Sequence, residues 1–506
     1  MNAAHERRLL RGLPCNYIGG RSLLLGAPGA ATDGEDIVSR DPARPRTEVW
    51  SARAPRAHVE SAVEAARRSL ARWRGAGSAG RAFVLEAWRD AVAERTDDLA
   101  RLITLETGKT LSESRLEAKS VAEKVTITLD PMVASRIAGW EFAVSPSRRG
   151  VCEFAPLGVV AVVGPFNFPA HLPNGHIVPA LLAGNSIVFK PSEKAPAVGQ
   201  WMGELAEAAG VPAGVFNVVH GGAATAAALV SHPGIDGILF TGSWPVGRRI
   251  LEANLDRPGR MIALEMGGSN PAIVLDDCHM TQSVVECVRG AFATAGQRCT
   301  CTRRIIVQLG VAAEFIALLC RGAANLVIGP GDSQDAVFMG PLITESARAA
   351  ALDFQSRLVG IGGELLLEAK PLDGEGWFLS PGVVQVDRFD GSMDEEVFGP
   401  IVQVAVVDSI DDAVEQANAT EFGLVASVFT ASRERFHAIA PRIRAGCVNW
   451  NVPTAGASSR LPFGGLGRSG NLRPAGALAI DACAAPVAHL LESSGEVTLP
   501  EGMRPF

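Results

Sequence analysis

The chain has 506 residues and a mass of 53.0 kDa, enough for roughly two to four domains, so a small metal- or disulfide-stapled fold is excluded. Lys and Arg (47) nearly balance Asp and Glu (54), and no long run of one sign occurs, which argues against a nucleic-acid partner. Apolar residues make up 47% of the chain, so it should fold throughout.

The first part of the chain has the apolar spacing of amphipathic helices. Apolar side chains recur three and four residues apart over 56–75 and 81–106, and helical character continues over 112–129. Pro131, Gly139, Pro146 and Gly150 then interrupt the pattern. We therefore expect one helix in each range and a projecting or connecting segment at 130–150.

From residue 158, short β-branched runs alternate with helical segments. This alternation is typical of βαβ units with parallel sheets. A second series of the same kind begins after residue 265, so we expect two α/β domains. The predicted strands are 159–163, 186–189, 215–219, 238–240, 272–275 and 304–308, and the predicted helices of the second series are 283–294 and 312–326.

The apolar runs and the cysteines bear on location. Gly or Pro interrupts every apolar run before the roughly 18 residues of a membrane span, and the N-terminal region lacks the pattern of an export signal. The nine cysteines are scattered, and the close pair Cys299 and Cys301 lacks a second pair at zinc-ligand spacing. We expect a cytoplasmic protein with free thiols, no membrane association and no metal site.

Two segments at predicted strand ends suggest a nucleotide site. Gly242 and Gly247 lie in a turn that opens a helix, where backbone N–H groups can meet a phosphate, although such a turn alone is more often a tight connection. Lys190 and Glu193 follow the strand 186–189, at the sheet edge where ligands of open α/β sheets bind. A solvated turn is the alternative. Together, the two segments make Lys190 and Glu193 candidates for the hydroxyls of an adenosine ribose.

Two further residues suggest nucleophilic chemistry. Cys299 follows a predicted helix between small and polar residues, although a cysteine is more often a small buried apolar residue. Glu265 is embedded in apolar and glycine-rich sequence, which favours a raised pKa and a role as a base. A helix cap or an ion pair is the alternative for Glu265.

Seven motifs in order resemble the aldehyde dehydrogenase superfamily. Within it, the stretches 167–193, 295–304, 444–451 and 462–474 are most similar to the N-succinylglutamate 5-semialdehyde dehydrogenases. Arg460 departs from that pattern, as does the absence of aromatic residues over 475–486. The motifs are 165–169 (PFNFP), 190–193 (KPSE), the turn 242–247, 265–268 (EMGG), 296–299 (GQRC), 396–400 (EVFGP) and 462–465 (PFGG).

The resemblance implies a catalytic set of three residues. The Cys299 thiolate would attack the aldehyde carbon, and the Asn167 side-chain amide with the Cys299 backbone N–H would hold the oxyanion. Glu265 would then activate the water that hydrolyses the thioester.

The resemblance also implies NAD as the cofactor. A carboxylate at Glu193 accepts from a 2′-hydroxyl and repels a 2′-phosphate, so NAD should be preferred over NADP. Trp244 is larger than expected beside the pyrophosphate. The implied cofactor residues are Lys190, Ser192 and Glu193 near the adenosine ribose, Gly242, Ser243 and Gly247 at the pyrophosphate, and Glu396 and Phe398 on the nicotinamide side.

Substrate residues are implied around the start of a helix after Asn167. There His171, Asn174 and Gly175 would share a face, with Gly175 widening an aldehyde tunnel. Arg298 and Arg460 are candidates to bind a substrate carboxylate, with a structural salt bridge as the alternative. His171 and His176 are expected as core or capping histidines rather than metal ligands. The substrate candidates are Phe168, His171, Arg298, Arg460 and Phe463.

The implied fold is α/β, with a Rossmann-type NAD-binding domain over 1–129 and 150–264 and an α/β catalytic domain over 265–470. A β-arm from 130–149 and 471–506 would join subunits into a homodimer or homotetramer, and 151–155 and 486–491 are strand-like. The leading function is oxidation of N-succinylglutamate 5-semialdehyde to N-succinylglutamate in arginine catabolism. Oxidation of another aromatic or aliphatic aldehyde, or a non-catalytic binding protein on this scaffold, are the alternatives.

Overall fold

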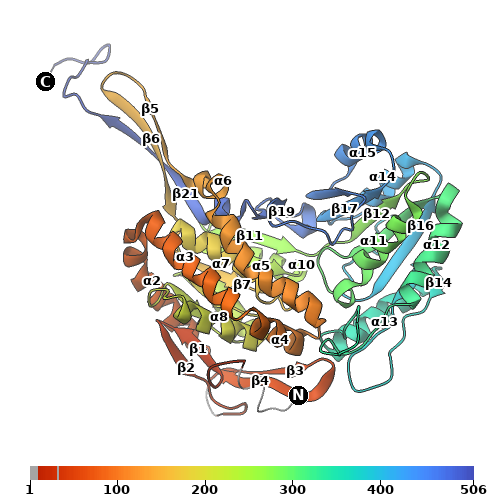
Figure 1. Ribbon diagram of the computed structural model, residues 1–506. Coiled ribbons are helices and arrows are strands. Elements are labelled where there is room, and N and C mark those ends of the chain that lie inside the picture. The colour runs from red at the N-terminus through yellow and green to blue at the C-terminus, as the bar shows by residue number, and fades with distance from the viewer. Residues whose placement is uncertain (1–8, 31–32, 506) are drawn as a thin grey trace.

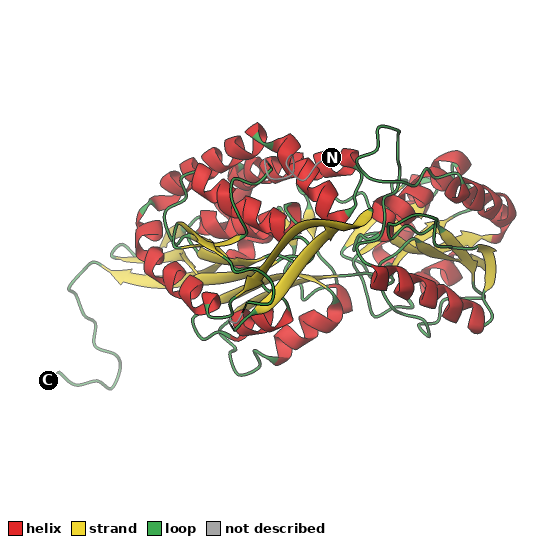
Figure 2. Ribbon diagram, turned by 90° about the horizontal axis from the view of Figure 1, so that it is seen from below, coloured by secondary structure: helices red, strands yellow, loops and turns green. Residues whose placement is uncertain are grey.

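The computed structural model describes residues 9–30 and 33–505, so parts of the predicted cofactor domain (1–8 and 31–32) and residue 506 lie outside the described residues. Within them, the chain forms two α/β bodies that lie side by side, each built on a seven-stranded sheet (Figure 1). Figure 2 shows strands between layers of helices in both bodies.

The first body begins with strands that the sequence analysis did not predict. β1 (Cys15–Ile18) and β2 (Arg21–Leu24) form a hairpin that extends the first sheet through antiparallel pairing of β1 with β9 (Phe216–Val218). β3 (Glu35–Asp41) and β4 (Arg44–Ala54) form a separate hairpin.

Four helices follow, and one prediction about them is wrong. α2 (His58–Gly75) and α5 (Leu111–Leu129) match the expected ranges, but 81–106 is not one helix. It divides into α3 (Gly77–Glu94) and α4 (Thr96–Thr107) at Arg95, whose φ of −120° and ψ of 23° leave the helical region. The Thr96 hydroxyl donates to the carbonyl of Val92, and acidic residues in the first turn of α4 favour a helix start there.

The first sheet contains the four predicted strands 159–163, 186–189, 215–219 and 238–240. Its order is β11-β10-β7-β8-β9-β1-β2, and β7 to β11 are mutually parallel. β7 and β8 are buried along their whole length, because helices cover both faces. The elements are β7 (Val159–Val163), α7 (His171–Ala183), β8 (Ser186–Lys190), α8 (Pro196–Ala208), α9 (Ala223–Ser231), β10 (Gly237–Gly242), α10 (Trp244–Glu252) and β11 (Met261–Met266).

The second sheet has the order β14-β15-β16-β13-β12-β17-β18 and is parallel except at β14. The predicted strands 272–275 and 304–308 are β12 (Asn270–Val274) and β13 (Thr302–Gln308), and the predicted helices are α11 (Met280–Phe292) and α12 (Leu309–Ala324). The other elements are α13 (Glu345–Gly360), β14 (Glu364–Leu367), β15 (Gly382–Gln385), β16 (Ile401–Val407), α14 (Ile410–Asn418), β17 (Val425–Phe429), α15 (Arg433–Ile439) and β18 (Cys447–Trp450).

A three-stranded arm projects from the first body (Figure 1). After the short helix α6 (Pro131–Ala134), β5 (Trp140–Ala143) and β6 (Arg148–Pro156) form a hairpin, and β21 (Ala484–Glu492) pairs with β6 along its whole length. The strand-like segments 151–155 and 486–491 are therefore antiparallel partners. Trp140, Phe142 and Leu490 on this arm are more than half exposed, which leaves apolar surface for a partner.

No helix of the described residues combines the length and apolar character that a membrane crossing requires.

We predict that deletion of residues 484–506 yields aggregated protein. The deletion removes β21 and exposes the edge of β6, and an isolated hairpin with a free edge is marginally stable and prone to pairing with other chains. Size exclusion with light scattering measures the outcome. A truncated chain that runs as a stable, monodisperse monomer would contradict the role of the arm in assembly.

Candidate active site

A cavity of about 950 Å³ contains the three predicted catalytic residues. It is lined by the ends of β7, β8, β10 and β11 of the first body and by the loop before β13 in the second body. Asn167, Glu265 and Cys299, which are far apart in the sequence, all line it. The structure therefore brings the predicted set together.

An unusual backbone turn aims Cys299 into the cavity. Thr294 and Ala295 have φ values of 55° and 54°, in the left-handed region that costs non-glycine residues free energy. Gly296 follows with a φ of 71°, and a Cβ there would lie 2.1 Å from the carbonyl oxygen of Gly399. The Asn270 side chain then donates to the carbonyl of Cys299 at 2.8 Å. The loop is thus held by close backbone packing and by a side chain of β12.

The Cys299 thiol does not ionise readily in this setting. Burial raises its pKa, and the nearby carboxylates of Glu396 and Glu265 raise it further, while Arg303 acts in the opposite direction. A base is therefore needed to form the thiolate at neutral pH.

Asn167 lies in the loop between β7 and α7 and reaches the Cys299 loop. Its Nδ2 donates to the carbonyl of Gln297 at 2.9 Å, two residues before Cys299. The amide has a second N–H, for which no partner is present among the described residues. This geometry fits the predicted role of Asn167 as an oxyanion donor.

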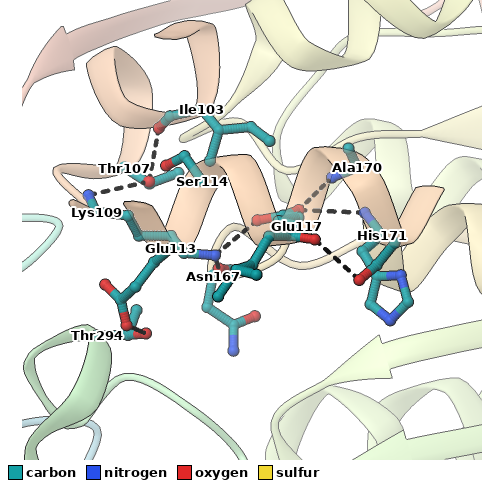
Figure 3. A network of polar contacts seen from close by, with 12 residues as sticks. Ile103, Thr107, Lys109, Glu113, Ser114, Glu117, Asn167, Ala170, His171 and Thr294 are labelled. Atoms are coloured by element: carbon teal, nitrogen blue, oxygen red, sulfur yellow. Dashed lines mark hydrogen bonds and ion pairs between the residues drawn. The ribbon is translucent and has the colours of Figure 1, made fainter. Parts of the chain in front are cut away.

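A buried ion pair that the sequence analysis missed fixes the Asn167 loop (Figure 3). Lys109 and Glu117 lie 2.6 Å apart, and both are almost fully buried. Nζ of Lys109 donates to the carbonyl of Asn167 at 3.1 Å, and the Glu117 carboxylate accepts from the N–H groups of Ala170 and His171. The pair joins α5 to the loop and to the start of α7.

Glu265 lies near the end of β11 and is 4% exposed. Burial raises its pKa well above the ordinary value, and only the Ala475 N–H lowers it. Gly464 leaves room for the carboxylate, since a Cβ there would lie 2.8 Å from Oε1 of Glu265. The raised pKa expected from the sequence is therefore present, and it suits a general base.

The predicted ribose residues lie at the end of β8. Lys190 is buried and pairs at 3.3 Å with Glu193, whose side chain is 46% exposed. Burial raises the pKa of Glu193, but the charges of Lys190 and Lys194 and the hydrogen bonds to the carboxylate together outweigh this effect and leave the pKa lowered, so the carboxylate is ionised at neutral pH. Ser192 also lines the cavity. A carboxylate here can accept from ribose hydroxyls.

Two helices begin beside these residues, and one of them is available for a phosphate. At the start of α9 the Glu35 carboxylate accepts from the N–H groups of Gly222 and Thr225, so a side chain of the protein occupies that terminus. At the start of α10, Ser243 makes no capping hydrogen bond within the described residues, and both Gly242 and Ser243 line the cavity. This terminus fits a pyrophosphate.

Gly247 and Trp244 have packing roles. Gly247 does not line the cavity, and a Cβ there would lie 2.4 Å from Sδ of Met266. This glycine lets α10 approach β11, and its contact with pyrophosphate stays a prediction. Trp244 also lies outside the cavity lining, with the Arg468 guanidinium 5.9 Å from its ring centre.

Glu396 and Phe398 line the cavity beside Cys299, as predicted for the nicotinamide side. Burial raises the pKa of Glu396 to about 7, while Arg303 and the Gly268 N–H lower it. Phe398 packs edge-on against Phe166, with 5.8 Å between ring centres.

The predicted substrate residues differ in whether they line the cavity. Phe168, His171 and Phe463 line the cavity, whereas Arg460 is exposed and does not line it, so its contact with a substrate carboxylate stays a prediction. Arg298 lines the cavity but pairs with Glu113 at 2.8 Å, which is the structural salt bridge left open above.

The face of α7 also differs from the prediction. Gly175 lines the cavity, with open space beside it, whereas Asn174 is fully buried. The Asn174 amide donates to the carbonyl of Val121 and accepts from the Trp88 indole N–H, so it is a core residue. His176 forms a hydrogen bond with Thr241, and burial lowers its pKa to about 4.

Comparisons with known proteins agree with the geometry. Residues 30–486 match the aldehyde dehydrogenase family. An NAD-dependent aldehyde dehydrogenase from Sinorhizobium meliloti is 28% identical with a TM-score of 0.92, covering 99% of this chain and 98% of that one. The chain is also similar to PnpE from Pseudomonas sp. WBC-3, with 32% identity and a TM-score of 0.89 over 97% of this chain and 100% of that one. It is 31% identical to an NADP dependent enzyme from E. coli, with a TM-score of 0.89 over 96% of this chain and 99% of that one.

We predict that Lys109→Met lowers the free energy of unfolding by about 3–5 kcal/mol, because Glu117 would remain buried without its cation. Urea unfolding measures the change. The double variant Lys109→Met with Glu117→Gln should recover part of the loss, since the amide oxygen still accepts from Ala170 and carries no charge. Equal stability of Lys109→Met and the unmodified chain would contradict the role of the pair.

Proposed function

This chain belongs to the aldehyde dehydrogenase family and is an aldehyde-oxidising oxidoreductase, and we propose that it uses NAD to oxidise an aldehyde that carries a carboxylate. The observation that carries this proposal is the meeting of Cys299, Glu265 and Asn167 in one cavity that also holds Lys190, Glu193 and the start of α10. A nucleophile, a base and an oxyanion donor therefore face the same space as a dinucleotide site.

The residues at the end of β8 support NAD over NADP. The Glu193 carboxylate is ionised and half exposed, so it accepts from a 2′-hydroxyl and repels a 2′-phosphate. When bound, NAD supplies the hydride acceptor beside Cys299. In this proposal 1–129 and 150–264 form the cofactor domain and 265–470 the catalytic domain.

The first chemical step is attack by Cys299. Because burial raises the pKa of this thiol, its proton must pass to a base before the sulfur attacks, and water in the cavity accepts it. The sulfur then bonds to the aldehyde carbon, and the carbonyl oxygen takes up the negative charge. The free N–H of the Asn167 amide and the Cys299 backbone N–H stabilise that oxyanion. Loss of hydride from the same carbon leaves a thioester on Cys299.

The second step returns the enzyme to its starting state. Glu265 removes a proton from a water molecule, whose oxygen bonds to the thioester carbon. The carbon–sulfur bond breaks, and Cys299 leaves as the thiolate. The product is a carboxylate.

N-Succinylglutamate 5-semialdehyde is the proposed substrate. The support is the resemblance over 167–193, 295–304 and 462–474, together with a cavity that is large enough for a branched acyclic aldehyde. An uncharged aromatic or aliphatic aldehyde is the second candidate, favoured by the commitment of Arg298 to Glu113 and by the exposure of Arg460. We also propose a cytoplasmic homodimer or homotetramer, held together by the arm.

Substituting the nucleophile tests the function. With NAD and a panel of charged and uncharged aldehydes, the wild type should form NADH, measured at 340 nm, and Cys299→Ala should abolish it while retaining NAD binding. Cys301→Ser is the matched control: Cys301 is fully buried and its thiol donates to the carbonyl of Ala293, which a hydroxyl can also do, so most activity should remain. Turnover by Cys299→Ala would remove this residue from the mechanism.

Glu265→Gln separates the two steps. We expect a single burst of NADH followed by a stall, because the variant lacks the base that activates water for thioester hydrolysis. Rapid mixing measures the burst, and its absence would mean that Glu265 is required in the first step. The wild-type turnover rate should rise with pH as Glu265, with its raised pKa, loses its proton, and the residual rate of Glu265→Gln should lack this rise.

A further inference from the structure

One wall of the cavity is a single face of α5. Glu113, Leu116, Glu117, Ser120 and Lys124 line the cavity, and their spacing of three and four residues places them along one side of the helix. Glu113 and Glu117 lie beside the catalytic loops, where they pair with Arg298 and Lys109. Lys124 lies two turns farther along, about 10 Å from Glu117 at ~1.5 Å per residue.

Lys124 is a buried cation without a carboxylate partner. It is 2% exposed, and its Nζ donates to the carbonyl of Gly476 at 2.5 Å. No Asp or Glu of the described residues forms a salt bridge with it, so none of its three donors has an anionic partner. Burial lowers its pKa to about 8, which still leaves it mainly protonated at neutral pH. A buried charge of this kind is costly unless an anion compensates for it.

A carboxylate compensates the charge of each of the other buried lysines of the described chain. Lys109 pairs with Glu117, and Lys190 pairs with Glu193. The two carboxylates on the face of α5 are already paired, so neither is free to compensate Lys124. An anion for Lys124 must therefore come from the contents of the cavity.

Lys124 carries a positive charge at neutral pH, whereas the two histidines beside it do not. Burial lowers the pKa values of His171 and His176, and the charge of Lys124 lowers both further, so the two rings are neutral at pH 7. Nδ1 of His171 has no hydrogen-bond partner within the described residues. Gly476 follows Ala475, whose N–H contacts the Glu265 carboxylate, so the anchor of Lys124 adjoins the catalytic base.

We propose that Lys124 binds a carboxylate of the substrate at the end of the molecule remote from the aldehyde. The proposal rests on the proposed function and specifies its substrate class: aldehydes whose carboxylate lies several bonds from the reacting carbon. Ser120 lies one turn before Lys124 on the same face and offers a hydroxyl to the same group. Specificity for a charged substrate then comes from α5, in place of the two arginines that the sequence suggested.

The test compares charged and uncharged aldehydes on Lys124→Met, a substitution that keeps an unbranched side chain at a buried position. For N-succinylglutamate 5-semialdehyde and for succinate semialdehyde, KM should rise about tenfold to a hundredfold, the range expected for loss of a charged hydrogen bond. For butanal and hexanal, kcat/KM should stay unchanged or increase. Lys119→Met, at an exposed position of the same helix, is the matched control and should leave both classes unchanged.

A second measurement keeps the outcome clear if Lys124→Met folds poorly. Lys124→Arg retains a cation and should keep the preference for charged aldehydes, whereas Lys124→Gln should lose it. Equal losses for charged and uncharged aldehydes in both Lys124→Met and Lys124→Gln would overturn the proposal. Absence of any aldehyde oxidation by the wild type would instead overturn the proposed function, so the two failures are distinguishable.

Discussion

The buried Lys109–Glu117 ion pair is the interaction on which the geometry of the site depends. Two charges removed from water are stable only in contact and with their remaining hydrogen-bond positions filled. Here the loop of Asn167 and the start of α7 fill those positions. The loop can therefore occupy one position against α5, and Asn167 in turn contacts the Cys299 loop of the second body. A pair with no chemical role thus sets the distance between the oxyanion donor and the nucleophile.

Burial is the common cause of the electrostatics in the cavity. It raises the pKa values of Cys299, Glu265 and Glu396, because a buried acid is less stable as an anion, and it lowers the pKa of Lys124, because a buried amine is less stable as a cation. The thiol therefore needs a base to ionise, and Glu265 has the proton affinity to take a proton from the water that hydrolyses the thioester. The same desolvation leaves Lys124 in need of an anion. Burial of these groups therefore underlies both the proposed catalysis and the proposed choice of substrate.

The sequence predicted the parts of this arrangement that lie at strand ends. Cys299 and Glu265 were candidates from their local sequence, Asn167 was implied by the resemblance to the aldehyde dehydrogenases, and all three line the cavity. The break at Arg95 was missed because the apolar spacing of α3 continues in α4 without a change of period.

The residues of α5 were missed for a different physical reason. In a helical pattern a polar residue such as Lys124 is expected to face solvent, and nothing local shows that it reaches a carbonyl 352 positions away. Lys109 lies in the loop before α5, and nothing local shows that it reaches a carbonyl 58 positions away. Arg460 and Gly247 lie outside the cavity lining, because a motif fixes where the backbone passes but not which of its residues face the cavity.

The covalent step through Cys299 is the central claim, and the mass of the enzyme tests it most directly. The Glu265→Gln enzyme is mixed with NAD and an aldehyde substrate, quenched in acid and digested. Mass spectrometry then measures the mass of the peptide that contains Cys299. The expected mass increase equals the mass of the aldehyde less two hydrogens, and it lies on Cys299 and not on Cys301. An unmodified Cys299 peptide from enzyme that has formed NADH would contradict it.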